Sequence, residues 1–261
     1  MKDSAAAKKS LGQHWLDDPA SLQAMCDAGD VNGADTVLEV GPGLGSLTQL
    51  LTQYAKQVVA VEFDRDLATG LSKCVPADNL KIMSQDILSF DFSTLPADYK
   101  LVANIPYYLT SNLIRTISEV PNRPVKAVML VQKEVAERAA AKPGDMSLLS
   151  VTAQFYWEVS LGQIVPAELF TPEPKVDSQI LKMERRDQTL FPDVDPKDFF
   201  RLARAGFSQR RKTLLNSLSG GLSFSRDETR ALCDRASVDC ERRAQTLSLD
   251  EWRQLYSALH A

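Results

Sequence analysis

Short apolar runs and helix-like stretches alternate along the first two thirds of this 261-residue chain. The runs are typical of strands, and the stretches between them carry apolar residues at helical spacing. Such an alternation is the signature of βαβ units around a mostly parallel, doubly wound sheet, so we expect an α/β fold. The expected strands are Thr36–Val40, Gln57–Phe63, Leu80–Ser84, Lys100–Ala103 and Val125–Val131; the expected helices are Pro19–Ala28, Ser46–Tyr54, Asp66–Cys74, Leu109–Glu119, Gln132–Ala140 and Met146–Trp157.

The pattern changes after a last pair of expected strands, Val159–Val165 and Gln179–Glu184. Beyond it the patterns are helical, and Gly220-Gly221 is expected to separate two of the helices, because paired glycines weaken a helix. The expected C-terminal helices are Lys197–Gly206, Arg210–Ser219, Arg226–Ala236 and Leu249–Leu259.

These patterns predict three parts. Residues 1–10 are expected to form a flexible tail, residues 11–188 an α/β domain, and residues 189–261 a small helical domain. We see no internal repeat in the sequence.

A glycine-rich loop follows the first expected strand. Gly41-Pro42-Gly43-Leu44-Gly45 leads directly into a helical pattern, as a nucleotide-binding strand–loop–helix requires. A dinucleotide site prefers glycine or alanine at residue 46, where this chain has Ser46. The spacing G-x-G-x-G instead suits a ligand without a pyrophosphate, such as S-adenosyl-L-methionine, with Gly41 and Gly43 close to it.

Two acidic residues accompany this loop at the ends of later strands. Glu62 ends the second expected strand, where a carboxylate can accept hydrogen bonds from both hydroxyls of a ribose. Asp86 follows the third strand, at a strand end that faces the ligand crevice of a doubly wound sheet. Asp86 is either a solvated loop residue or an acceptor for the amino group of the cofactor's adenine.

Asn104-Ile105-Pro106-Tyr107 follows the fourth expected strand and suits the alkylation of an exocyclic amine. The side-chain oxygen of Asn104 and the carbonyl of Ile105 can each accept one N–H of the amine. Pro106 fixes its own φ and favours an extended Ile105. Tyr107 offers a ring face on which a base can stack. The alternative is a strand-end turn with a buried tyrosine, and the glycine loop upstream favours the catalytic interpretation.

Composition excludes several classes of protein. No apolar run approaches the roughly 18 residues that a membrane span needs, and the N-terminus lacks the apolar region of a secretory signal. The four cysteines have no CxxC spacing and there are only two histidines, so we expect no metal site. These features predict a cytoplasmic protein in a reducing compartment.

The charge distribution is more informative than the net charge of −4. The stretch Phe199–Ser225 contains five basic residues and no acidic one. Such a stretch is either a solvated helix face or a set of phosphate contacts whose affinity falls with salt. The five residues are Arg201, Arg204, Arg210, Arg211 and Lys212.

Taken together, these residues resemble the small-subunit ribosomal RNA adenine N6-dimethyltransferase family over nearly the whole chain. The motifs that carry the resemblance include the glycine loop and the Asn104–Tyr107 tetrapeptide. The two motifs most specific to the family are Phe170–Ser178 and Phe207–Lys212. The other matching segments are Leu11–Leu16, Glu62–Asp64, Gln85-Asp86, Tyr108 and Gln132–Val135.

The resemblance implies a class I S-adenosylmethionine-dependent methyltransferase fold with a small C-terminal helical domain that binds RNA. It implies cofactor contacts from His14, Leu16, Gly41, Glu62, Asp86 and Asn104, and a target adenine held by Asn104, Ile105 and Tyr107. The implied substrate is a pair of adjacent adenosines in a hairpin loop near the 3′ end of small-subunit rRNA, each dimethylated at N6. A monomer that acts on a pre-ribosomal particle is the expected form.

The chain departs from the family pattern at two places. His14 stands where asparagine is usual and Trp15 where phenylalanine is usual. Ser147-Leu148 replaces a Gly-Arg pair that often precedes Leu149-Ser150-Val151 in bacterial members. The first departure lies in the N-terminal segment expected to cover the cofactor. The second lies in a loop from which RNA contacts are expected.

Three other functions remain as alternatives. One is an adenine methyltransferase with another target, either large-subunit rRNA or DNA, against which Phe170–Ser178 and Phe207–Lys212 argue. Another is a ribosome-assembly factor whose binding role outweighs methylation. The third, a nicotinamide oxidoreductase, is disfavoured by Ser46 and by the Asn104–Tyr107 tetrapeptide.

Overall fold

A computed structural model describes residues 13–261 of the chain, so the expected tail at residues 1–10 lies outside the described residues. The chain divides into two compact units. The first contains residues up to Ala136 together with Val159–Arg185, and the second contains Glu137–Glu158 together with Arg186–Ala261. The segment Glu137–Glu158 therefore joins the C-terminal helices, a division that differs from the boundary at residue 188 expected from sequence.

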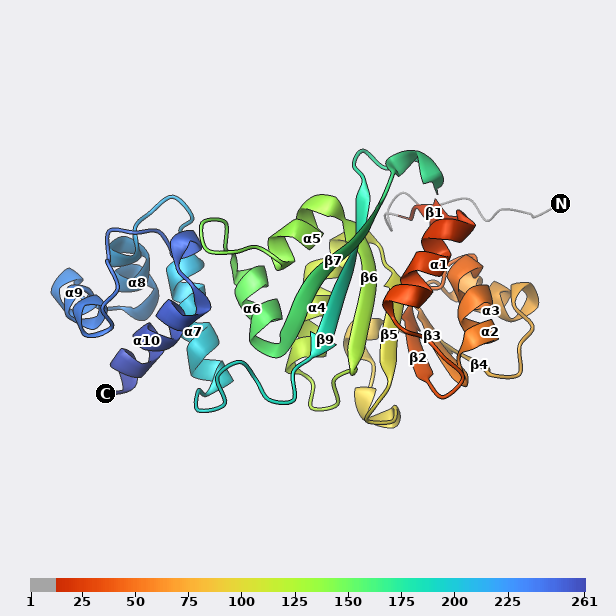
Figure 1. Cartoon of the computed structure of the whole chain (residues 1–261), viewed down its shortest axis with the longest axis horizontal. Helices are drawn as coiled ribbons and strands as arrows, with labels where there is room; N and C mark the ends of the chain where they lie inside the picture. Colours follow the sequence, from red (N-terminus) through yellow and green to blue (C-terminus); the bar gives the residue numbers. More distant parts are fainter. Residues whose placement is uncertain (1–12) are drawn as a thin grey trace. The chain divides into compact units, whose positions relative to one another are not determined.

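A seven-stranded sheet forms the centre of the first unit, in the order β4-β3-β2-β5-β6-β9-β7 (Figure 1). The strands β2 to β6 run parallel to one another, and β9 pairs with β6 in the antiparallel direction. The expected doubly wound, mostly parallel sheet is confirmed. The strands are β2 (Thr36–Val40), β3 (Gln57–Glu62), β4 (Leu80–Ser84), β5 (Lys100–Asn104), β6 (Lys126–Gln132), β7 (Trp157–Val165) and β9 (Ser178–Arg185).

The strand order reverses direction between β2 and β5, which lie side by side. Right-handed crossovers on the two sides of this point place their helices on opposite faces of the sheet. Helices α1 and α2 share one apolar cluster with the valines of β2, β3, β5 and β6. The helices of this unit are α1 (Pro19–Ala28), α2 (Ser46–Tyr54), α3 (Arg65–Cys74) and α4 (Thr110–Glu119), and α5 (Lys133–Ala139) continues into the second unit.

A two-stranded ribbon joins two segments that are far apart in sequence. The short strand β1 (Trp15–Leu16) pairs in the antiparallel direction with β8 (Phe170–Thr171). Leu16 and Phe170 are both buried and belong to the same apolar cluster as α1 and α2. Periodicity could not indicate this ribbon, because a strand of two residues has no repeat to detect.

The second unit is helical, as expected for the C-terminal part, with a core of aromatic rings. Phe155 stacks on Phe199 at 5.0 Å between ring centroids and meets the edges of Phe191 and Phe200. These contacts explain why the helix that carries Phe155 belongs to this unit. Its helices are α6 (Leu148–Tyr156), α7 (Pro196–Phe207), α8 (Leu214–Leu222), α9 (Arg226–Arg235), α10 (Leu249–His260) and the short 3-10 helix η6 (Ala244–Thr246).

Gly220-Gly221 does not separate two helices, so that expectation is wrong. Helix α8 runs through both glycines to Leu222, and its C-cap residue Ser223 has a left-handed φ of 60°. A Cβ atom on Gly221 would lie 2.5 Å from the Cβ of Ala205 in α7. Gly221 is therefore a close-packing residue, because it lets two helices approach each other.

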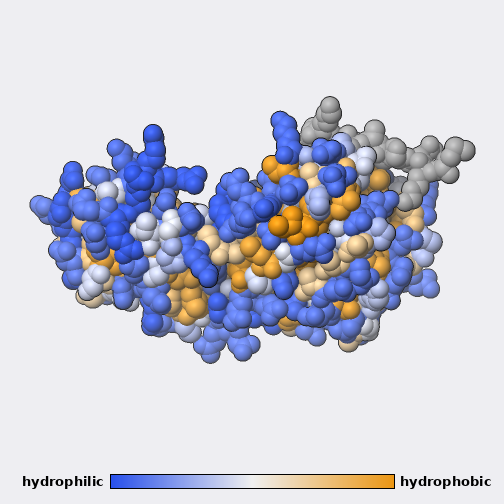
Figure 2. Space-filling model, turned by 45° about the horizontal axis from the view of Figure 1, so that its top comes forward, coloured by the Kyte–Doolittle hydropathy of each residue, from blue (hydrophilic) through white to orange (hydrophobic). Residues whose placement is uncertain are grey.

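The surface of the molecule is mainly hydrophilic on the face shown in Figure 2, with a patch of hydrophobic residues on the sheet-containing unit. Exposed large side chains on or near β7 include Leu161, Ile164 and Leu169.

Within residues 13–261, none of the helices combines the length and the apolar character that crossing a membrane requires.

Candidate active site at the switch point of the sheet

The candidate site lies where the strand order reverses. Strands β2 and β5 are parallel neighbours, so their carboxyl ends meet at one edge of the sheet. The glycine loop leaves β2 after Val40, and Asn104 is the last residue of β5. Ligands of open α/β sheets bind at such switch points.

The glycine loop has a conformation that side chains disfavour. Gly41, Gly43 and Gly45 all have positive φ angles, of 66°, 56° and 88°. At Gly43 the space is also closed, because a Cβ atom would lie 2.5 Å from the indole ring of Trp15. The loop therefore presents bare backbone to the pocket and to Trp15.

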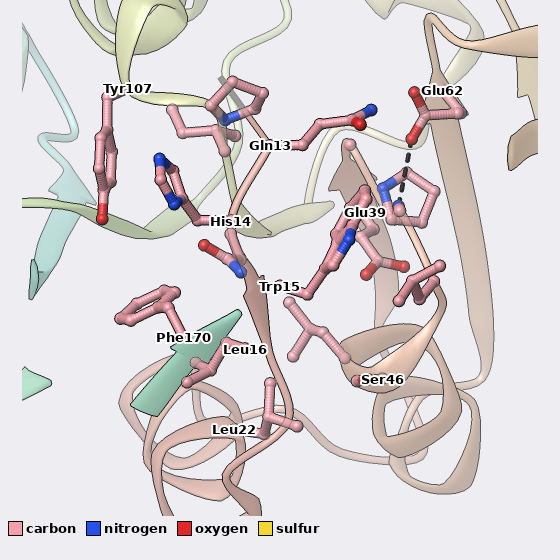
Figure 3. A pocket seen from close by; sticks show the side chains of 18 residues that line it. Gln13, His14, Trp15, Leu16, Leu22, Glu39, Ser46, Glu62, Tyr107 and Phe170 are labelled. Carbon is pink, nitrogen blue, oxygen red and sulfur yellow. Dashed lines mark hydrogen bonds between the residues drawn. The ribbon is translucent and has the colours of Figure 1, made fainter. Parts of the chain in front are cut away.

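Glu62, the last residue of β3, forms a hydrogen bond with the backbone of the glycine loop. Its carboxylate accepts a hydrogen bond from Gly43 N at 3.1 Å and another from Asp64 N at 2.9 Å (Figure 3). Burial raises the pKa of Glu62, an effect that these two backbone donors oppose. Each carboxylate oxygen keeps a further lone pair, so the group can still accept a ligand hydroxyl.

Nine of the sequence-predicted residues line one pocket, whose side chains are drawn in Figure 3. Asp86 lies in an adjoining pocket of about 250 Å³ and accepts Leu88 N at 2.9 Å, which leaves its second oxygen available. The two pockets share Gln13, Gly41, Glu62 and Pro106, so they lie next to each other. The nine are His14, Leu16, Gly41, Gly43, Glu62, Asn104, Ile105, Pro106 and Tyr107.

The Asn104–Tyr107 segment presents polar groups and one aromatic ring. The amide of Asn104 forms no side-chain hydrogen bond with any other described residue, whereas Ile105 is buried beside it. Tyr107 Oη lies 2.8 Å from Ser178 Oγ, and burial raises the pKa of the Tyr107 hydroxyl. This contact fixes the ring while leaving the acceptor groups of Asn104 and Ile105 available.

His14 lies beside Tyr107 in the same pocket. Its imidazole stacks on the Tyr107 ring at 5.6 Å between centroids and 22° between planes, as Figure 3 shows. Because Pro172 O can only accept, Nδ1 of His14 donates to it at 2.6 Å. The structure thus places His14 next to the expected base-stacking ring, at the end of the β1–β8 ribbon.

Two polar atoms that sequence reasoning did not select are buried in this pocket without a partner. Glu39 is 1% exposed, and its Oε2 forms no hydrogen bond within the described residues; nor does Nε1 of Trp15. Burial raises the pKa of Glu39 to about 8. Both side chains lie on the Glu62 side of the pocket (Figure 3). The signal for Glu39 was an acidic residue inside the apolar strand Thr36–Val40.

The five basic residues of the stretch Phe199–Ser225 are all exposed. Arg201 and Arg204 lie on α7, and Arg201 pairs with Asp198 at 3.5 Å. The others occupy the turn before α8, which begins at Leu214 and not at Arg210 as expected. No group of three or more potential metal ligands occurs within residues 13–261.

Comparison with known proteins gives matches over nearly the whole chain. The model of the ribosomal RNA adenine dimethylase family matches residues 4–260. The chain is 46% identical over 257 residues to the ribosomal RNA small subunit methyltransferase A of Dehalococcoides mccartyi strain 195, covering 95% of this chain and 87% of the relative. The enzyme of the same name from Clostridioides difficile is 39% identical over 263 residues, with coverages of 97% and 90%.

Solved structures confirm the fold. A dimethyladenosine transferase from Plasmodium falciparum superposes with a TM-score of 0.78 at 25% identity and covers 92% of this chain and 95% of its own. The 23S rRNA methyltransferase ErmE superposes with a TM-score of 0.71 at 27% identity, with coverages of 95% and 100%. The class I methyltransferase fold and the family resemblance are therefore confirmed, and this chain belongs to the ribosomal RNA adenine dimethylase family.

Proposed function

We propose that this protein transfers methyl groups from S-adenosyl-L-methionine to N6 of two adjacent adenosines in the 3′-terminal hairpin loop of small-subunit rRNA. The observation that carries the proposal is the Asn104–Tyr107 segment beside the glycine loop at the switch point. The choice of the small subunit rests on relatives of that name at 39–46% identity, against 27% for the solved 23S enzyme.

The pocket has the donors and acceptors that the cofactor needs. Glu62 would accept from the ribose hydroxyls and Asp86 from the adenine amino group, in the adjoining pockets that they line. The cofactor, when bound, supplies a methyl group on a positively charged sulfur. The unpaired atoms of Glu39 and Trp15 would complement the ammonium and the carboxylate at the amino-acid end.

Asn104 and Ile105 would orient the acceptor nitrogen. An adenine amine is a weak nucleophile because its lone pair is delocalised into the ring. Two acceptors, the Asn104 side-chain oxygen and the Ile105 carbonyl, would hold its N–H groups and direct the lone pair out of the ring plane. Catalysis then comes mainly from positioning. The methylated nitrogen loses its proton readily, so a dedicated general base is unnecessary.

The RNA substrate must present an unstacked base. A base that reaches Tyr107 has left its helix, which favours a loop over a duplex. The basic residues at 201–212 would hold backbone phosphates without reading sequence. The helical domain at residues 189–261 thus serves RNA binding, and the protein acts as a cytoplasmic monomer on a pre-ribosomal particle.

Asn104→Ala tests the assignment of the acceptor. We expect methyl transfer to unmethylated small-subunit particles to fall on the order of a hundredfold, as when one positioned polar group is removed from an active site. Binding of S-adenosylhomocysteine, measured by calorimetry, should weaken much less. Asn112→Ala, an exposed asparagine on α4, is the matched control. Unchanged turnover in Asn104→Ala contradicts its role.

The competing functions give different results in the same assay. If particles of the large subunit accept the methyl groups instead, the small-subunit assignment is wrong. If Asn104→Ala abolishes methylation and yet fully restores subunit maturation in cells that lack the protein, the assembly role outweighs methylation.

A further inference from the structure

A second pocket lies entirely within the C-terminal unit. It has a volume of about 240 Å³, just below the range of roughly 300–1,000 Å³ typical of small-molecule sites, so it suits a fragment the size of one nucleotide. Its walls come from the end of α5, the start of α6, the end of α7 and η6. The side chains that matter here are Arg138, Met146, Leu149, Phe207, Arg210 and Gln245.

Hydrogen bonds hold these walls together before any ligand arrives. Gln245 O accepts from Gly144 N at 2.9 Å and from Met146 N at 3.1 Å, and Gln245 Nε2 donates to Gly144 O at 3.1 Å. Gln154 Nε2 donates to the carbonyls of Ala139 and Ala141. The loop between α5 and α6 is thereby fixed to η6 and to α6, so the pocket is preformed.

The charge of the pocket is positive. Arg138 and Arg210 line it, and none of the described residues that line it is acidic. Arg138 Nε is buried without a hydrogen-bond partner in the described part of the chain. By contrast, Arg242 pairs with Glu251, and Arg253 with Asp193 at 2.9 Å. A buried donor without a partner calls for an explanation, and an anion that accepts from it supplies one.

Two further features suit a nucleotide. The first turn of α6 opens into the pocket at Leu148 and Leu149, and the N–H groups of a helix start favour negative charge. Ser147 caps this helix by accepting from Ser150 N. Met146, Leu149 and Phe207 give the pocket an apolar side, against which a sugar or a base can pack.

We infer that this pocket binds one nucleotide of the RNA substrate, with the phosphate between Arg138 and Arg210 and the sugar or base against Phe207. The inference rests on the proposed function, because it takes the substrate to be RNA. It adds Arg138, which lies outside the basic stretch at 201–212, to the RNA-binding residues. One phosphate would then bind in a preformed pocket, whereas the other phosphates would contact exposed basic residues.

Arg138→Met tests the inference, since methionine keeps an unbranched apolar stem at this position. Because hydrogen bonds to charged groups are the strong ones, we expect RNA affinity to fall about tenfold. The slope of log affinity against log salt should become shallower by about 0.7–0.9, the value for one phosphate contact. KM for the particle should rise while kcat at saturation stays unchanged.

Two further variants separate a fitted pocket from general charge. Arg138→Lys keeps the charge but loses the planar fork of the guanidinium, so it should not restore affinity. Arg226→Met removes an exposed arginine of the same unit that does not line the pocket, and it should leave KM unchanged. Melting temperatures close to that of wild type would show that all three variants are folded.

The outcomes distinguish this inference from the proposed function. If the wild-type protein methylates small-subunit particles and Arg138→Met has an unchanged KM and salt slope, the pocket does not hold RNA. If Arg138→Lys binds RNA as tightly as wild type, Arg138 contributes only its charge, and the inference of a specific nucleotide pocket is wrong. If the wild-type protein methylates no small-subunit particle, the proposed function itself fails.

Discussion

Two polar atoms in the candidate active-site pocket have no partner within residues 13–261, and their hydrogen-bonding characters are opposite. Trp15 Nε1 is a donor, and Glu39 Oε2 accepts when the carboxylate is ionised. An α-amino acid carries one acceptor group and one donor group, so the pair matches the methionine end of the cofactor. Leaving such atoms unsatisfied costs about 1–3 kcal/mol each, which a bound zwitterion would recover.

Trp15→Phe should weaken cofactor binding without weakening the fold. The variant keeps an aromatic ring against Gly43 and removes only a donor that is unpaired within the described residues. We expect the Kd of S-adenosylhomocysteine to rise about tenfold, because hydrogen bonds to charged groups contribute about 1.5–3 kcal/mol. Calorimetry measures this change. Methylthioadenosine lacks the amino-acid end, and an equal loss of affinity for it would refute the assignment of Trp15.

Glu39 should make stability depend on pH. Its pKa is raised from 4.5 to about 8 in the folded protein because the carboxyl is buried. The folded state therefore holds a proton that the unfolded state has released, and stability falls as pH rises through this window. Urea unfolding at about pH 5 and about pH 9 should show a larger loss for wild type than for Glu39→Gln. Equal losses would mean that Glu39 is ionised throughout.

At the scale of elements, close packing of α7 on α8 depends on a residue without a side chain. A Cβ atom on Gly221 would lie 2.5 Å from that of Ala205, whereas the nearest atom to one on Gly220 is 3.9 Å away. Neighbouring glycines in one helix thus have different roles. Gly221 is required by tertiary contact, and Gly220 only lowers helix propensity.

Gly221→Ala should destabilise the protein by about 1–3 kcal/mol, the usual effect of overpacking. Gly220→Ala is the matched control and should be neutral or stabilising by up to about 1 kcal/mol, because alanine favours a helix. Chemical denaturation of both variants gives the comparison. Similar free energies of unfolding for the two would show that the helices can separate without cost.

The sequence predicted the regular helices and strands well, but it did not predict the features that depend on tertiary packing. The strands Thr36–Val40 and Leu80–Ser84 and the helix Ser46–Tyr54 have the predicted bounds, because their apolar residues follow the spacing typical of each element. Gly220-Gly221 was misjudged because a glycine pair looks the same whether it breaks a helix or packs against one. The orphaned atoms of Trp15 and Glu39 depend on what surrounds them, which only three-dimensional packing determines.

At the scale of the whole molecule, the net charge of −4 does not favour binding to RNA. Affinity must then come from local charge, such as the exposed residues Arg211 and Lys212 in the turn before α8. Within residues 13–261, neither forms an ion pair with an acidic residue. Both are therefore available for phosphates.

Replacing Arg211 and Lys212 with glutamate should weaken binding of the substrate RNA and flatten its dependence on salt. The slope of log affinity against log salt should become shallower by about 1.4–1.8, because each of the two lost phosphate contacts removes about 0.7–0.9. Filter binding over a range of salt concentrations measures it. A slope equal to that of wild type would assign these residues to the solvated surface.

The β1–β8 ribbon has a practical consequence for protein engineering. Trp15 and Leu16 are both wall residues of the pocket and partners of Thr171 and Phe170. A shortened version that begins after Leu16 would therefore lose the strand that pairs with β8 together with two wall residues of the candidate site. Expression tags and truncations should leave every residue from Gln13 onward in place.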